Sequence, residues 1–150
     1  MRKKKPEAFL TPGERESVEE AVAQAERHTS GEIKIFIDRF CWEDIEEKAA
    51  RVFRKLRLDE TAGRNGVLIY IVTTNREFLI HGDEGIDRAV PDNFWDDVRG
   101  RMQQDFRAGE FGNGLVAAIH AIGEKLGRYF PREEDDVNEI SDNVEYGTER

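Results

Sequence analysis

Apolar residues recur along this chain at two different spacings, which predict where helices and strands lie. Spacings of three and four residues predict helices from Gly13 to about His28 and from about Glu43 to Leu56. Runs and alternations of β-branched residues predict strands at Glu32–Asp38, Val67–Thr73 and Glu77–His81. Two later helical patterns consist of Phe94, Trp95, Val98, Met102 and Phe106, and of Leu115, Ile119, Ile122 and Leu126, with a glycine-rich turn at Gly109–Gly114 between them.

The resulting order, α-β-α-β-β-α-α, predicts an α/β domain in which helices cover both faces of a small mixed sheet, an α/β/α sandwich. A helix joins the first two strands, so we expect these strands to be parallel with a right-handed crossover. The Thr74-Asn75 connection is short enough for a hairpin, which makes the third strand antiparallel to the second. The third strand therefore ends at the sheet edge where the first two begin.

This edge gathers acidic residues, and the segment Gly82–Asn93 after the third strand is predicted to be an acidic loop. Strand order brings residues from the starts of the first two strands to the same place. Hard divalent cations prefer carboxylate, amide and carbonyl oxygens as ligands. We therefore predict a Ca²⁺ site here, with Mg²⁺ as the alternative ion. The candidate metal ligands are Glu32, Asn65, Asp83, Glu84, Asp87 and Asp92.

A simpler interpretation of the same acids is a solvated loop in which Asp92, behind Pro91, caps the following helix. The histidines, His28, His81 and His120, show no zinc-ligand spacing and are expected to be structural. No nucleophile motif surrounds Ser30 or Cys41, so the sequence names no catalytic residue.

Net charge separates the chain into two parts. The total is −9, and residues 132–150 carry eight acids against two arginines. Such a segment buries too little apolar surface to offset its ordering entropy. We therefore expect a domain over residues 1–131 and, over residues 132–150, an acidic tail that is disordered or loosely docked. The acidic balance also argues against nucleic acid as a partner.

Other features favour a cytoplasmic location with no membrane partner. Cys41 is the one cysteine, which fits a reducing compartment. The basic start, Arg2–Lys5, is not followed by the apolar segment of a signal peptide. The longest apolar run, Val67–Val72, is too short to span a bilayer.

The chain resembles the TPM domain family, which includes the thylakoid acid phosphatase-like proteins. The resemblance extends over roughly Phe9 to Phe130. It rests on Gly31-Glu32-Ile33, Asn65-Gly66-Val67-Leu68, Gly82-Asp83-Glu84-Gly85-Ile86-Asp87, Val90-Pro91-Asp92, and Gly109-Glu110-Phe111 through Gly114-Leu115.

What the resemblance implies is an α/β/α sandwich that binds a divalent metal, often calcium, at its acidic loops. Asp87 and Asp92 carry over best, whereas Arg64 stands where longer members have an aspartate. Those longer members tend to have a signal peptide and a membrane anchor, so we expect this chain to be a stand-alone cytosolic form.

Two functions follow from the resemblance. One is a calcium-binding or regulatory module that presents its ordered loop to a protein partner. The alternative is a metal-dependent acid phosphatase acting on phosphate monoesters. In the second case Glu32 or Glu84 is the candidate general base, and Arg64 and Arg88 are the candidate phosphate clamps.

Overall fold

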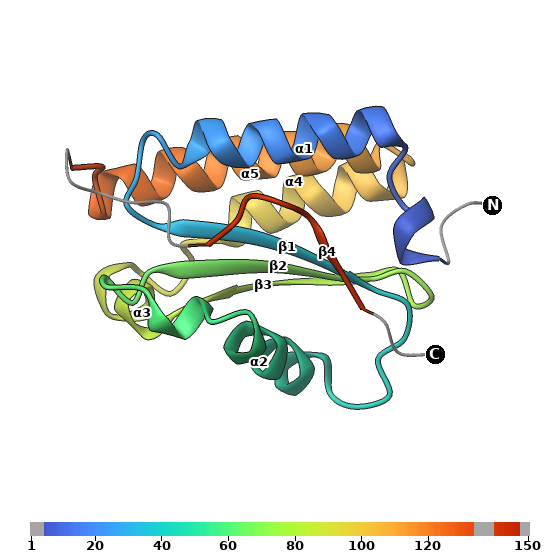
Figure 1. The fold of residues 1–150 in the computed structure, drawn as a ribbon, viewed down its shortest axis with the longest axis horizontal. Coiled ribbons are helices and arrows are strands. Elements are labelled where there is room, and N and C mark those ends of the chain that lie inside the picture. Colours follow the sequence, from blue (N-terminus) through green and yellow to red (C-terminus); the bar gives the residue numbers. More distant parts are fainter. Residues whose placement is uncertain (1–4, 134–139, 148–150) are drawn as a thin grey trace.

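A four-stranded sheet runs through the centre of the computed structural model, which describes residues 5–133 and 140–147 (Figure 1). The strand order is β3-β2-β1-β4, with β1 at Glu32–Asp38, β2 at Gly66–Val72, β3 at Glu77–Gly82 and β4 at Glu145–Tyr146. β1 and β2 are parallel and β3 is antiparallel to β2, which confirms the predicted topology.

Burial explains why β1 and β2 are central. All seven residues of each strand are buried, because both faces of the sheet are covered. Ile33, Ile35 and Ile37 pack into a core on one face, and Leu68 and Tyr70 pack into a second core on the other. β2 accordingly reads as a continuous apolar run, whereas β1 also carries the buried polar residues Glu32, Lys34 and Asp38.

Helices cover the two faces unequally, as Figure 1 shows. One face carries three helices: α1 (Pro12–Ala25), α4 (Asp96–Arg107) and α5 (Phe111–Tyr129). The other carries α2 (Ile45–Lys55), and short 3-10 helices η1 and η2 lie at Pro6–Ala8 and Leu58–Glu60. The predicted α/β/α sandwich is therefore confirmed. Within the described residues, no helix has the length and apolarity needed to cross a bilayer.

The glycine-rich segment before α5 is more helical than predicted. We expected a turn over Gly109–Gly114, but α5 begins at Phe111 and only Gly109 has a left-handed backbone, with φ of 79°. A Cβ added at Gly112 would lie 2.8 Å from Glu14 Cγ, and one at Gly114 would lie 2.8 Å from Asp105 Cβ. These glycines let α5 pack closely against α1 and α4.

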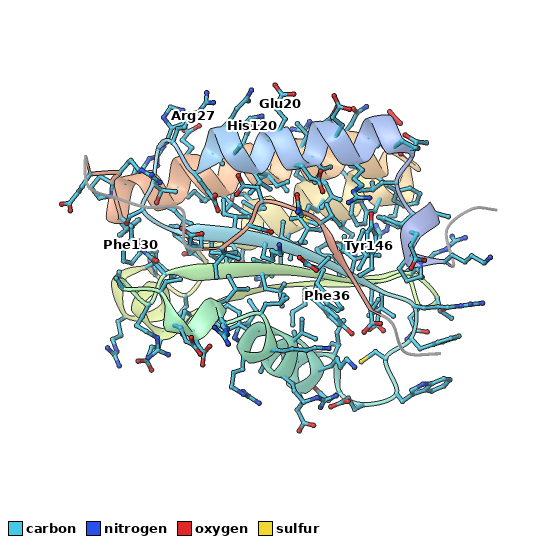
Figure 2. The ribbon with its side chains drawn as sticks, in the orientation of Figure 1. Glu20, Arg27, Phe36, His120, Phe130 and Tyr146 are labelled. Atoms are coloured by element: carbon cyan, nitrogen blue, oxygen red, sulfur yellow. The ribbon has the colours of Figure 1, made fainter. Side chains whose placement is uncertain are left out.

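Part of the predicted tail is a strand of the sheet. β4 pairs in parallel with the outer edge of β1, where Phe36 is opposite Glu145 and Ile37 is opposite Tyr146. Val144 is only 4% exposed and belongs to the core beneath α1. Figure 2 shows Tyr146 on this edge of the sheet. Residues 140–147 are therefore ordered against the domain and not disordered, and how firmly they are docked stays a prediction; residues 134–139 and 148–150 lie outside the described residues.

Polar groups of the domain hold this segment in place. Glu32 Oε1 accepts a hydrogen bond of 2.9 Å from the backbone N–H of Ile140. Lys34 Nζ donates to the carbonyl oxygen of Ser141 at 3.0 Å and lies 3.1 Å from a carboxylate oxygen of Glu145. Glu32 and Lys34 are both buried in β1, where a polar group without a hydrogen-bond partner is costly. Residues 140–147 supply these partners, so the contacts stabilise both the strand and the segment.

Candidate functional site

Half of the acidic segment after β3 is a helix. α3 spans Glu84–Ala89 and begins at the N-cap residue Asp83, whose carboxylate accepts a 2.8 Å hydrogen bond from the N–H of Glu84. The prediction of a loop over Gly82–Asn93 is wrong for this stretch. Aspartate is a favoured N-cap residue, and the fully buried Ile86 anchors the short helix to the core.

Arg64 fastens α3 to the turn that precedes β2. Its Nε donates to Asp83 Oδ2 at 2.8 Å and its Nη2 donates to Asp83 Oδ1 at 3.1 Å. Its Nη1 lies 3.0 Å from Glu84 Oε1. The hydrogen bonds to Asp83 raise the pKa of Arg64 above its usual value. Two predicted metal ligands, Asp83 and Glu84, therefore already face a cationic group of the protein.

Gly85 allows this close approach. Its N–H donates to the carbonyl oxygen of Arg64 at 3.0 Å, and Arg64 has a left-handed backbone with φ of 49°. A Cβ at Gly85 would lie 2.5 Å from that carbonyl oxygen and 2.6 Å from the carbonyl oxygen of Gly63. Only a residue without a side chain lets α3 rest on this turn.

Glu32 and Asn65 reach the predicted sheet edge, but their side chains have other contacts. Glu32 pairs with Gly66 along the strands, at the end of the sheet where Asp83 lies. Its carboxylate nevertheless accepts a hydrogen bond from the N–H of Ile140. The buried Asn65 accepts from Thr61 Oγ1 and donates to Ser30 Oγ, each at 3.2 Å. Both therefore stabilise neighbouring segments.

Asp87 and Asp92 are exposed and differ from the other acids in their partners. Neither forms an ion pair with any residue in the described part of the chain. The alternative interpretation, in which Asp92 caps the next helix, is wrong because α4 begins at Asp96 and Trp95 occupies its N-cap. Asp92 lies instead in the turn where the N–H of Phe94 donates to the carbonyl oxygen of Pro91 at 3.1 Å.

The predicted ligands thus do not form one cluster. Across residues 5–133 and 140–147, no group of three or more His, Cys, Asp or Glu side chains is arranged to hold a metal ion. The structure brings Asp83 and Glu84 together around Arg64 and leaves Glu32 and Asn65 with separate partners. A calcium ion bound by Asp83 or Glu84 would have to displace Arg64 from that carboxylate. A calcium ion bound by Asp87 and Asp92 would require both side chains to turn toward it.

Of the three histidines, His81 is partly buried, whereas His28 and His120 are exposed. His81 packs edge-on against Phe53, with ring centroids 4.8 Å apart. Burial lowers the pKa of His81, and the opposing charges of Asp87 and Asp83 do not reverse this shift. His120 is exposed and projects from α5 on the side away from the sheet (Figure 2).

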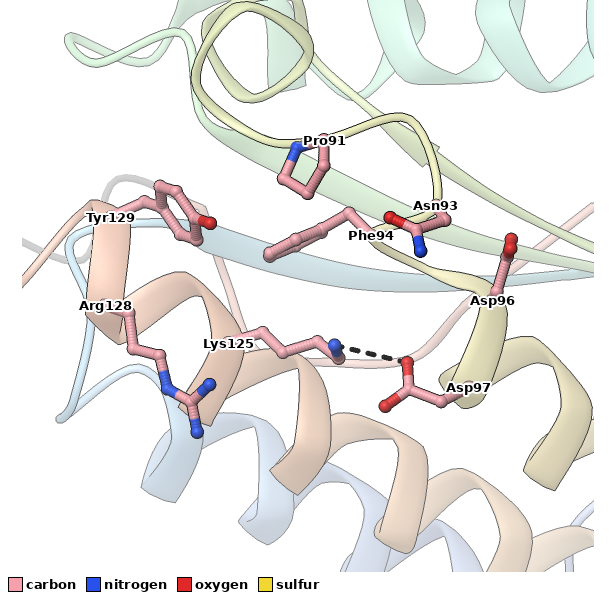
Figure 3. Close-up of a pocket in the computed structure, with 8 residues that line it drawn as sticks. All are labelled: Pro91, Asn93, Phe94, Asp96, Asp97, Lys125, Arg128 and Tyr129. Carbon is pink, nitrogen blue, oxygen red and sulfur yellow. Dashed lines mark ion pairs between the residues drawn. The ribbon is translucent and has the colours of Figure 1, made fainter.

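A pocket of about 430 Å³ adjoins the acidic edge (Figure 3). It lies between the α3–α4 connection and the last turns of α5. Lys125 Nζ is 3.2 Å from Asp97 Oδ1 and 5.0 Å from the centroid of the Phe94 ring, which also contacts Tyr129 edge-on. Sequence reasoning missed Lys125 and Tyr129 because α5 reaches the edge only through tertiary packing.

Glu26 is another residue that the sequence analysis did not single out. It is 4% exposed, and its Oε2 accepts a 2.8 Å hydrogen bond from the N–H of Ile33. Burial raises the pKa of Glu26 to about 10, and hydrogen bonding to Asp142 acts in the same direction. The sequence did contain a sign of this burial: Glu26 lies four residues after Val22, in line with the apolar stripe of α1, so its side chain faces the core.

Comparisons with known proteins agree with this architecture. No curated protein matches the chain. The solution structure of BA42 protein from the psychrophilic bacterium Bizionia argentinensis is 39% identical, with a TM-score of 0.88 over 93% of this chain and 96% of that one. The N-terminal domain of a P. gingivalis protein shares the fold, with 17% identity and a TM-score of 0.61 over 83% of this chain and 82% of that one. The family model of the TPM domain matches residues 4–125, so this chain belongs to the TPM domain family.

Proposed function

We propose that this chain is a calcium-binding module whose ion binds at the α3 edge and presents that edge to a protein partner. The observation that carries the proposal is the pair of exposed acids, Asp87 and Asp92, that have no ion-pair partner among the described residues. They are also the acids that carry over best from the family pattern.

Charge balance at this edge supports the proposal. Asp83 and Glu84 share Arg64, and Glu84 also lies 3.3 Å from Arg88 Nη2. Adding Asp87 and Asp92 leaves more carboxylates than cationic groups. Unpaired carboxylates repel one another, and a divalent cation relieves that repulsion. Calcium suits this arrangement better than magnesium, because it accepts irregular sets of carboxylate, carbonyl and water oxygens.

Binding has more support than hydrolysis of phosphate esters. In many phosphatases an arginine or lysine contacts the phosphoryl oxygens beside the metal ion. The candidate clamps, Arg64 and Arg88, both form ion pairs with Glu84. The catalytic alternative therefore rests on family resemblance, and fold membership alone does not establish chemistry.

Calorimetric titration with calcium chloride tests the proposal. We expect binding by the wild type and weaker binding by Asp87→Asn and by Asp92→Asn. The matched control is Glu16→Gln, which removes an exposed carboxylate from α1 and should leave the isotherm unchanged. The proposal is wrong if the wild type shows no heat of calcium binding. It is also wrong if both aspartate variants give the same isotherm as the wild type.

Two further measurements separate the alternatives. A parallel magnesium titration should show weaker binding than calcium. Turnover of a generic phosphate ester, with and without EDTA, measures the catalytic alternative. If the wild type hydrolyses the ester, EDTA abolishes this activity and Asp87→Asn lacks it, the protein is a metal-dependent phosphatase and not only a binding module.

A further inference from the structure

At the opposite end of the sheet, a groove of about 670 Å³ opens beside the β2–β3 hairpin. Figure 1 shows this hairpin, η1 and the α4–α5 turn gathered at the same end of the molecule, away from α3. Four phenylalanines from four different segments line the groove: Phe9, Phe78, Phe106 and Phe111.

The aromatic lining is continuous. Phe106 is the hub, with ring centroids 5.4 Å from Phe78, 5.4 Å from Phe111 and 5.9 Å from Phe9, all in edge-to-face arrangements. Phe78, Phe106 and Phe111 remain partly exposed although they pack against the core. Solvent-accessible aromatic surface gathered in a concave site is typical of a binding pocket.

The rim of the groove is cationic. Arg76 from the hairpin and Arg99 and Arg107 from α4 line it, against one acid, Glu77. Arg99 forms an ion pair with Asp96, whereas Arg107 forms none with a described residue. With Asp96 counted, three arginines face two acids here, in contrast to the net charge of −9 for the whole chain.

We propose that this groove binds an apolar carboxylate, with the hydrocarbon or aryl part on the phenylalanines and the carboxylate among the arginines at the rim. Guanidinium groups bind carboxylates through charge-assisted hydrogen bonds. The volume lies within the range of about 300–1,000 Å³ usual for small-molecule sites. The groove lies at the other end of the sheet from α3, so the proposal does not depend on calcium binding.

Calorimetric titration of the full chain with sodium decanoate and, separately, with sodium naphthoate tests the proposal. We expect at least one carboxylate to bind the wild type. Decyltrimethylammonium has the chain length of decanoate and the opposite charge, so it should bind about tenfold more weakly than the carboxylate that binds. Equal binding of decyltrimethylammonium, or no heat from either carboxylate, would overturn the proposal.

Variants on α4 locate the binding. Gln103 is exposed and lines the groove, so Gln103→Trp should fill it and abolish binding. Arg107→Gln should weaken binding by about tenfold through loss of a charge-assisted contact. Arg101→Gln is the control, because Arg101 is exposed on the same helix but pairs with Asp105 outside the groove.

Sedimentation of the same variants tests a different occupant. A monomeric wild type that binds a carboxylate, with binding lost in Gln103→Trp, supports the small-molecule site. Undiminished carboxylate binding by Gln103→Trp overturns it. A wild-type dimer that Gln103→Trp converts to a monomer also overturns it, because the groove would then hold a second copy of the chain.

Discussion

The guanidinium group of Arg64 holds the carboxylate of Asp83 in a two-pronged contact, with Nε 2.8 Å from Oδ2 and Nη2 3.1 Å from Oδ1. Asp83 is 6% exposed, so Arg64 neutralises a carboxylate that water reaches poorly. Arg64 is therefore a permanent cation beside Asp83 and Glu84, and a metal ion at this edge would compete with it for both carboxylates.

Replacement of Arg64 by glutamine should change stability and calcium affinity in opposite directions. Without calcium, Arg64→Gln leaves Asp83 unpaired, and we expect a lower melting temperature. With calcium, the freed carboxylates become ligands, and we expect tighter binding in a calorimetric titration. Arg101→Gln, which removes an exposed arginine paired with Asp105, should alter neither quantity. Unchanged calcium affinity in Arg64→Gln would show that Asp83 and Glu84 are not ligands.

A methyl group at Gly85 should separate α3 from the turn before β2. The added Cβ meets backbone oxygens of Gly63 and Arg64, which cannot rotate away. We expect Gly85→Ala to lower the free energy of unfolding by about 1–3 kcal/mol in urea denaturation.

Gly100 provides the matched control for this substitution. A Cβ there meets nothing within 4 Å, and the residue lies inside α4. Gly100→Ala should therefore stabilise the protein by about 0.5–1 kcal/mol. Equal effects of the two substitutions would mean that the α3 contact is not needed for stability.

The buried carboxyl group of Glu26 should make stability depend on pH. Its folded pKa is about 10, well above the ordinary glutamate pKa of 4.5, so folding takes up a proton between these pH values. The stabilisation is complete below the unfolded pKa and is lost as pH rises toward the folded one, by up to about 1.4 kcal/mol per pH unit. Thermal unfolding should show a falling melting temperature between about pH 5 and about pH 9.

Glu26→Gln isolates this effect, because the amide keeps an oxygen for the N–H of Ile33 and cannot ionise. The variant should be more stable than the wild type at alkaline pH and close to it near about pH 5. The exposed α1 residue Glu16, changed to glutamine, should leave the wild-type pH profile intact. Parallel profiles for the wild type and Glu26→Gln would assign the pH dependence to other groups.

Truncation of Val144 measures how firmly the C-terminal strand is bound. Val144 is 4% exposed beneath α1, and its N–H donates to Glu19 Oε2 at 2.9 Å. Val144→Ala removes two buried carbon atoms and should cost about 1–2 kcal/mol in chemical denaturation. Asn143→Ala alters an exposed neighbour and should have little effect. A stability loss near zero in Val144→Ala would mean that the segment is only loosely attached.

Some elements could be predicted from the sequence because burial in the core alone determines their position. β1 matches its predicted bounds because every residue from Glu32 to Asp38 is buried. α3 was missed because its pattern is weak: it is six residues long and buries only Ile86. Short helices of this kind depend on capping and tertiary contacts more than on periodicity.

The candidate site was harder to predict, because its side chains form hydrogen bonds and ion pairs with residues that are far away in the sequence. Topology correctly brought Glu32 to the edge where Asp83 lies. The sequence could not reveal that Glu32 contacts Ile140, which lies 108 residues away. Nor could it reveal that Arg64 would reach Asp83 and Glu84, since that contact depends on the left-handed backbone of Arg64 and on Gly85.

The pairing of β4 with β1 also bears on solubility. β1 is the most apolar candidate for an exposed edge, with Ile33, Ile35 and Ile37 on one face. An uncovered apolar edge strand is a template for pairing with strands of other molecules, and charged residues there oppose such pairing. The segment from Ile140 to Gly147 pairs with this edge at Phe36 and Ile37 and carries the acids Asp142 and Glu145. Proteolytic loss of that segment would therefore expose the edge of β1 at Phe36 and Ile37 to pairing with strands of other molecules.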